Sequence, residues 1–272
     1  MLRISLPLAL GLLIALLATP GRLQAHEFWI DADLWTAVPG QEITASLRVG
    51  QLFVGAGYSF NPQRFQRFDV VAGEQVQAVP GVIGDRPAFQ MAFDEPGLKV
   101  VVHETTTTSL RYTEWEKFVA FVEHKDLSGT LEAHASRGLP DTGFVEAYSR
   151  HAKALLAVGD AAGSDQEIGL VTELVALANP YSDDVSGGVP VRLLYLGEVR
   201  PDSQIEVFER AEDGTVAVSL VRTDAQGVAL VPVKPGHDYM LDAVLMRPTP
   251  VDQAEAGPVW ESLWANLTFS VP

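Results

Sequence analysis

Residues 42–49, EITASLRV, alternate apolar and polar side chains directly after the turn residues Pro39 and Gly40. This period of two is typical of a strand with one buried face. Glycine and proline separate further segments of the same kind, so we expect an antiparallel sandwich over residues 26–112. The pattern recurs in three later segments: 67–71, 88–93 and 98–103.

Strand-like segments return after residue 165. Their number suits an immunoglobulin-like or transthyretin-like sandwich, which we predict over residues 165–272. The predicted fold is therefore mainly β, with two antiparallel β-sandwich domains joined by a short helical segment, residues 113–164. The segments concerned are 170–178, 189–196, 204–209, 215–221, 228–231, 239–245 and 267–271.

The middle of the chain changes to helical spacing. Residues 113–116, TEWE, have the form of a capping box, in which Thr113 and Glu116 bind free amides at a helix start. A second helix is predicted over residues 144–155, because Gly159 suits a left-handed helix end. The apolar stripes that support the two helices are Trp115, Phe118, Val119 and Val122, then Phe144, Ala147, Tyr148, His151, Ala152 and Leu155.

Residues 1–25 are predicted to be a cleavable signal peptide. Arg3 precedes an apolar run over residues 4–18, and Ala25 is a small residue suited to cleavage before His26. An uncleaved anchor is the alternative, but the run is shorter than the ~20 residues that a spanning helix needs. We therefore expect a protein that works outside the cytoplasm, without a membrane span after cleavage.

Composition excludes several classes of protein. The formal net charge is −16, and loss of Arg3 and Arg22 with the signal peptide makes it −18, so nucleic acid is a poor partner. The absence of cysteine excludes disulfides and a lipid-anchor cysteine. The sequence contains no GxSxG, GxxxxGK[ST] or HExxH motif, and it gives no positive indication of an enzyme.

Histidine offers the clearest chemistry. Cleavage after residue 25 would give His26 a free α-amine beside its imidazole, and these two nitrogens can chelate one transition metal. A second histidine would complete a three-nitrogen site of the kind that copper and nickel accept, and we predict His103 and His124 as the histidines that join His26. Glu27 and Glu104 are possible partners that orient an imidazole.

The other three histidines are weaker metal ligands. His151 lies in an apolar stripe and is expected to be a core residue. His134 lies in a polar segment and His237 in a turn, and neither has a neighbour at metal-ligand spacing.

Several segments resemble the periplasmic component of bacterial cobalt and nickel uptake systems, a family filed as a domain of unknown function, DUF4198. The resemblance covers nearly all of the predicted mature chain and implies a periplasmic metal-binding protein whose initial histidine corresponds to His26. The family motif does not require histidine at positions 103 or 124. The segments that carry the resemblance are 25–30 (AHEFWI), 116–127, 148–156 (YSRHAKALL), 177–181 (LANPY) and 260–265 (WESLWA).

The leading hypothesis is a non-enzymatic periplasmic metal-binding protein, an accessory or carrier for uptake of nickel, cobalt or copper. An inner-membrane metal transporter is a possible partner. One alternative is a copper-dependent oxidative enzyme with a histidine brace, which would need an exposed aromatic surface formed by Trp29, Trp35 and Tyr58. Another alternative is a structural or adhesive β-sandwich protein without metal.

Overall fold

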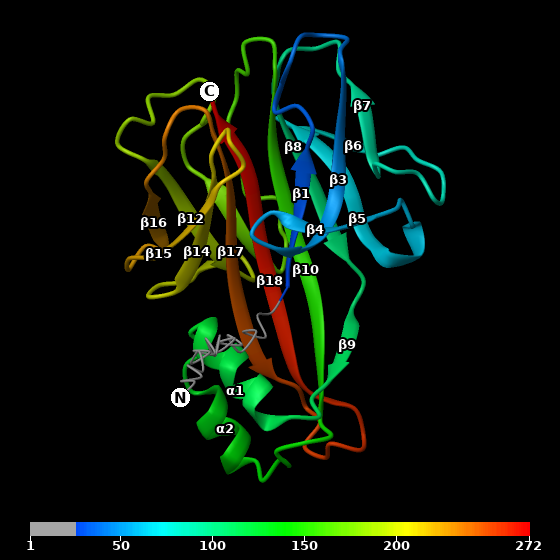
Figure 1. Cartoon of the computed structure of the whole chain (residues 1–272), viewed down its shortest axis with the longest axis vertical. Helices are drawn as coiled ribbons and strands as arrows, with labels where there is room; N and C mark the ends of the chain where they lie inside the picture. The colour runs from blue at the N-terminus through cyan, green and yellow to red at the C-terminus, as the bar shows by residue number, and fades with distance from the viewer. Residues whose placement is uncertain (1–25) are drawn as a thin grey trace, which may run out of the picture.

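The computed structural model describes residues 26–272, so the predicted signal peptide, residues 1–25, lies outside the described residues. The chain is mainly β, as predicted, and its strands form three sheets (Figure 1). The first sheet has the order β1-β3-β4, with β7 also paired to β3. Its strands are β1 (Glu27–Ala32), β3 (Glu42–Gln51), β4 (Val54–Tyr58) and β7 (Phe89–Ala92).

The central sheet has ten strands in the order β15-β14-β17-β18-β10-β8-β5-β6, with β2 and β9 also paired to β10. Its strands are β2 (Thr36–Ala37), β5 (Phe65–Ala72), β6 (Gln75–Ala78), β8 (Gly97–Thr105), β9 (Thr108–Arg111), β10 (Val145–Val158), β14 (Gln204–Arg210), β15 (Val216–Arg222), β17 (His237–Pro248) and β18 (Pro258–Val271). The third sheet consists of β11 (Thr172–Ala176), β12 (Val189–Tyr195), β13 (Glu198–Val199) and β16 (Val228–Val231).

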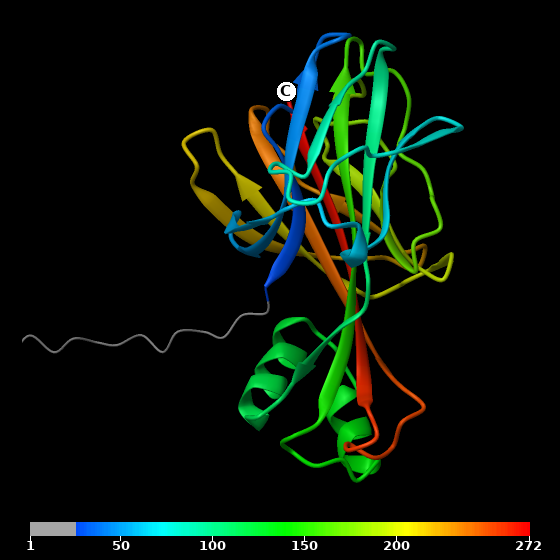
Figure 2. The ribbon, with the colours of Figure 1, turned by 90° about the vertical axis from the view of Figure 1, so that its right-hand side faces the viewer.

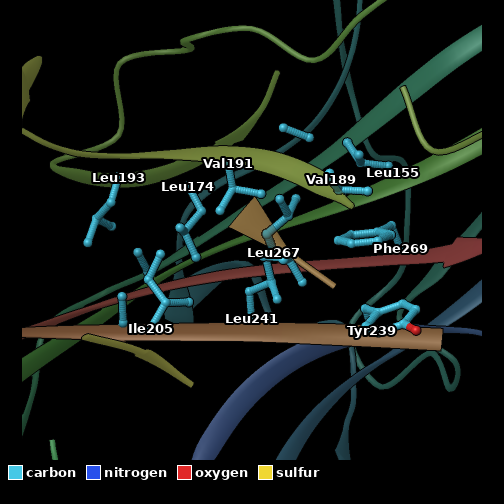
Figure 3. Packing of buried hydrophobic residues seen from close by; sticks show 14 of the residues in the cluster. Leu155, Leu174, Val189, Val191, Leu193, Ile205, Tyr239, Leu241, Leu267 and Phe269 are labelled. Carbon is cyan, nitrogen blue, oxygen red and sulfur yellow. The ribbon is translucent and has the colours of Figure 1, made fainter. Parts of the chain in front are cut away.

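The central sheet separates two apolar cores. Alternate residues of β8 point to opposite faces, so that Val101 enters the core under the first sheet while Val100 and Val102 enter the core under the third. Figure 3 shows the second of these cores, where Leu155 of β10 and Leu241 of β17 approach the third sheet. Burial of each such side chain stabilises the fold by about 1.5–3 kcal/mol.

Strands from both predicted sandwich ranges belong to the central sheet, and β10 lies between them. β18 pairs with β10 in parallel from Val145 to Ala154, whereas β8 pairs antiparallel with β10 from Leu155 to Val158. The sheet is therefore not wholly antiparallel, and it is continuous across the predicted boundary at residue 165. The division into two domains stays a prediction.

The second predicted helix, residues 144–155, is wrong, because this segment is strand β10. From His151 onward every residue of β10 is buried, since both faces of the strand are covered by a core. A strand buried on both faces has a nearly continuous apolar run, and periodicity alone does not distinguish such a run from a buried helix.

Two helices cover the ends of β10, β17 and β18 that extend past the other strands, as the two views turned by 90° both show (Figure 1 and Figure 2). α1 (Trp115–His124) confirms the first predicted helix, and α2 (Thr130–Ser136) lies where no helix was predicted. The predicted capping box is wrong: Glu114 is the N-cap residue and no side chain caps the helix. Phe118 and Val122 are buried as expected, and they pack with Trp260 of β18 in a third core. A short 3-10 helix, η1, spans Pro62–Arg64.

No helix within residues 26–272 combines the length and the apolar character that crossing a membrane requires.

Candidate functional site

A cavity of about 800 Å³ lies where α1 meets the strands. Residues of α1 line it together with residues of eight strands: β1, β3, β4, β5, β8, β9, β10 and β18. Figure 1 shows the start of β1, the strand β9 and the helix α1 around the lower halves of β10 and β18. The cavity therefore lies between the first sheet, the central sheet and the helices.

The charge of this cavity is opposite to that of the whole chain. Five of its lining residues are cationic and one is acidic, whereas the chain contains 35 acidic and 19 basic residues. A cavity lined by one sign of charge concentrates ligands of the other sign. The cationic residues are Arg64, Arg86, Arg111, Lys117 and Arg150.

Arg150 is the most constrained of these cations. It lies directly opposite Trp264 in the parallel pair of β10 and β18, and its guanidinium carbon is 5.2 Å from the centroid of the Trp264 ring. The same carbon lies 5.3 Å from the Tyr148 ring and 5.9 Å from the Phe28 ring. Burial lowers the pKa of Arg150, although an arginine stays charged in proteins. The aromatic rings thus fix a planar cation at the cavity wall.

The acidic residue of the cavity, Glu146, is already bound by protein donors. Tyr112 donates its hydroxyl to Glu146 Oε2 at 2.7 Å, and the Ser262 hydroxyl donates to Oε1. Trp264 Nε1 in turn donates to Ser262 Oγ at 3.0 Å. Burial raises the pKa of Glu146, while the hydrogen bonds from Ser262 and Tyr112 oppose this shift. This chain of hydrogen bonds also orients the ring on which Arg150 lies.

His26 and His103 both line the cavity. His26 is exposed, and its backbone carbonyl accepts a hydrogen bond of 2.8 Å from Arg150 Nη1. His103 is buried, and neither of its ring nitrogens has a hydrogen-bond partner in the described structure. Burial lowers the pKa of His103 to about 3, so the imidazole is neutral at pH 7.

Three phenylalanine rings surround His103. The centroid of the His103 ring lies 4.6 Å from the ring centroid of Phe65, 5.0 Å from that of Phe68 and 5.1 Å from that of Phe28. A neutral imidazole with free nitrogens is the form that binds metals, and it is here held in an apolar wall.

A second cluster of charged side chains surrounds Lys125, next to the Trp264 ring. Lys125, the residue after α1, is buried with its Nζ 3.2 Å from Glu27 Oε1 and 2.9 Å from Asp242 Oδ2, and it also donates to Glu206. Glu206 and Asp242 lie directly opposite each other on β14 and β17. Nζ is 5.0 Å from the centroid of the Trp264 ring, so this ring contacts both Lys125 and the cavity residue Arg150.

The protonation of this cluster follows from burial and charge. Burial raises the pKa of Glu27 to about 7 and also raises that of Asp242. Burial has the same effect on Glu206, but hydrogen bonds and charge from His124 and Lys125 outweigh it and lower the pKa. For Lys125, burial opposes the charge, but the three carboxylates outweigh burial and raise the pKa. The ammonium therefore holds three acids together.

Among residues 26–272, the carboxylates of Glu27, Glu206 and Asp242 form a set of three potential metal ligands within 4.8 Å of one another. Lys125 contacts all three, so an ion at this position would have to displace a buried ammonium. The cluster is better explained as a structural ion-pair network.

The residues predicted to bind or orient a metal lie at different positions in the structure. His26 and His103 line the cavity, and Glu27 belongs to the Lys125 cluster. His124 Nε2 lies 2.8 Å from Glu206 Oε1, on the outer side of that cluster. Glu104 lies 3.5 Å from His151 Nδ1. The described structure does not gather the three histidines into one group of potential ligands.

The remaining histidines have structural surroundings. His151 is buried, as expected, but on a strand. His134 is also buried: its Nδ1 accepts from Trp260 Nε1 at 3.0 Å, which requires the other ring nitrogen to donate to the Pro140 carbonyl at 3.1 Å. His237 Nδ1 lies 2.8 Å from Glu209 Oε1.

The three aromatic residues predicted to form a surface near His26 lie in different surroundings. Trp29 is fully buried in a core and Trp35 packs against another, while Tyr58 is exposed at the cavity.

The sequence alone does not indicate Arg150 or Lys125 as site residues. Arg150 belongs to the segment YSRHAKALL, for which the sequence predicts a helix, and a helix would not pair Arg150 with Trp264 of a neighbouring strand. Lys125 follows the predicted helix, and no local pattern indicates partners 81 and 117 positions away.

Comparisons with known proteins give one informative match. The family model described as a domain of unknown function, DUF4198, matches residues 23–247. No curated protein matches the chain.

Two solved structures show a distant likeness. The D0-D1 domain of Intimin has 15% identity and a TM-score of 0.22, with 89% of this chain and 97% of that chain covered. A tetra-tandem repeat in the extending region of a large adhesion protein has 11% identity and a TM-score of 0.19, with 90% of this chain and 49% of that chain covered. These scores are low, so neither likeness bears on the function of this chain.

Proposed function

The chain belongs to the DUF4198 family, and from this premise we propose that it is a non-enzymatic periplasmic protein that binds a divalent transition metal at the mouth of the cavity. His26 is the principal ligand, through its imidazole and the α-amine that signal cleavage would expose. Nickel, cobalt or copper would be the cargo, delivered to an inner-membrane transporter for which this protein is an accessory or carrier.

The position of His26 is the observation that supports this proposal. Its side chain is exposed at the cavity, while its carbonyl is held by Arg150, so the start of the predicted mature chain is fixed beside a cavity. A chelating pair of nitrogens on an anchored residue needs little ordering when a metal binds.

His103 is the second histidine in this proposal and supplies the third nitrogen. It lines the same cavity and is neutral at pH 7, with both ring nitrogens free of hydrogen bonds. His124 is not required, because its ring nitrogen is engaged by Glu206. Copper should bind most tightly in vitro whatever the natural cargo, because the affinity of nitrogen sites rises toward copper along the first-row series.

Calorimetry on the protein that starts at His26 tests this function. We expect one equivalent of Cu²⁺ to bind, with Ni²⁺ and Co²⁺ weaker. His26→Ala should abolish binding, and so should one extra glycine before His26, because it displaces the α-amine and keeps every side chain. His237→Ala is the matched control, since His237 is paired with Glu209 and does not line the cavity. Absence of stoichiometric binding, or binding that neither change affects, would refute the proposal.

A further inference from the structure

We infer that the cavity binds a small organic carboxylate with an apolar body, and that the guanidinium of Arg150 receives the carboxylate. This binding does not depend on a metal ion, because it uses the cationic side chains and the apolar walls of the cavity. It therefore goes beyond the function proposed above.

The distribution of unpaired cations supports the inference most directly. Among residues 26–272, six lysine and arginine side chains have no carboxylate within ion-pair distance. Four of the six line this one cavity, in a chain where acidic residues greatly outnumber basic ones. These four are Arg64, Arg86, Arg111 and Arg150, and the other two are Lys99 and Arg200.

Arg150 is arranged as a recognition group. Its Nη1 binds the His26 carbonyl, and its flat faces lie against aromatic rings. Arginine can donate five hydrogen bonds, so most of its donors are left for a ligand. A planar guanidinium in fixed orientation binds a carboxylate through two parallel hydrogen bonds. Arg150 is half-buried, and partial removal from water makes such a pair stronger than one in bulk solvent.

The three other arginines form a wider positive field. Arg64, Arg86 and Arg111 are exposed, and the last two donate to the backbone carbonyls of Gly57 and Gly143. Those contacts orient the side chains without neutralising them. The field attracts an anion, and Arg150 fixes its orientation.

The walls favour an organic ligand over a bare inorganic anion. The lining includes six large apolar side chains: Phe28, Leu47, Val49, Phe65, Phe121 and Trp264. Phe121 stacks on Trp264 with ring centroids 5.6 Å apart, so the wall next to Arg150 is flat and aromatic. A volume of about 800 Å³ is ample for a drug-sized molecule. A ring or chain can lie against this wall while its carboxylate reaches Arg150.

Calorimetry with three probes separates charge from apolar contact. The probes are 3-phenylpropionate, its uncharged analogue 3-phenylpropanol, and acetate, which carries the charge without the ring. The protein is first freed of metal with a chelating resin, so a failure of the metal proposal does not affect the result. We expect 3-phenylpropionate to bind at least about ten-fold more tightly than either analogue, because it alone uses both kinds of contact.

Variants locate the binding. Arg150→Gln should weaken 3-phenylpropionate at least about ten-fold, and Arg150→Lys should recover part of that loss. Arg192→Gln should change nothing, because Arg192 is paired with Glu167 and lies outside the cavity. Should Arg150→Gln fail to fold, the exposed pair Arg64→Gln and Arg86→Gln should still weaken binding several-fold at low salt. Equal binding of the acid and the alcohol, or no binding of any probe at millimolar concentration, would overturn the inference.

Discussion

Lys125 and Asp242 form a buried ion pair that joins positions 117 residues apart, with Nζ 2.9 Å from Oδ2. The same ammonium contacts Glu27 of β1 and Glu206 of β14, so one cation connects the first sheet, the central sheet and α1. Removal of this charge would leave three carboxylates facing one another away from water.

Lys125→Met should therefore destabilise the protein by about 3–5 kcal/mol, because an uncompensated buried charge costs far more than the pair contributes. Urea unfolding at pH 7 measures this difference. Lys234→Met is the matched control, because Lys234 pairs with Glu209 on the surface and should cost no more than about 1 kcal/mol. Equal losses in the two variants would contradict the structural role of Lys125.

Glu27→Gln should alter the pH dependence of stability. Burial raises the pKa of Glu27 from 4.5 to about 7, so the folded protein holds a proton that the unfolded chain releases. Stability should therefore fall as pH rises from 4.5 to about 7, and the variant should lack this part of the fall, on the order of 1–3 kcal/mol. Unfolding free energies of both proteins across this range provide the measurement, and parallel curves would exclude the shift.

His103→Leu should raise stability at pH 7 by about 1 kcal/mol, because it removes two buried nitrogens without hydrogen bonds. Burial lowers the pKa of His103 from 6.5 to about 3, so the unfolded chain takes up a proton that the folded protein does not. The wild type should therefore lose stability as pH falls through this range, and the variant should lose less. Denaturation at pH 7 and pH 4 tests both points. If His103 binds the metal as proposed, the same substitution weakens metal binding. The free energy of unfolding should then rise while the affinity for the metal falls.

Gly55→Ala should destabilise the hairpin that forms one wall of the cavity, by about 1–3 kcal/mol. A Cβ atom at this position would lie 2.2 Å from the carbonyl oxygen of Val49 on the neighbouring strand. Gly57→Ala, two residues along the same strand, is the control, because a Cβ there would meet nothing within 4 Å. Thermal unfolding of the two variants should differ clearly, and equal midpoints would exclude the steric explanation.

The sequence predicted those parts of the fold that local patterns determine. Residues 42–49 fall within β3, and the apolar stripe from Trp115 falls on α1, because each of these elements has one buried and one exposed face. β10 was mistaken for a helix because both of its faces are buried. Its parallel pairing with β18, more than a hundred residues later, leaves no local signal.

The candidate site could also be predicted only in part. The chemistry of histidine indicates His26 and His103 as candidate ligands, and both line the cavity. The cavity itself depends on which strands are neighbours, and so does the contact of Arg150 with Trp264. Residue type can therefore be read from the sequence, whereas the environment that decides its charge and accessibility cannot.

The place of β18 in the central sheet also bears on how the chain folds. β18 lies between β10 and β17, and it supplies Leu267 and Phe269 to one core and Trp260 and Trp264 to another. Neither core can close before residues 258–271 have been synthesised and have found partners far away in the chain. Pairings of such high contact order form slowly. In a nascent chain, the segments that build these two cores should thus stay open, and accessible to chaperones, until β18 has been synthesised.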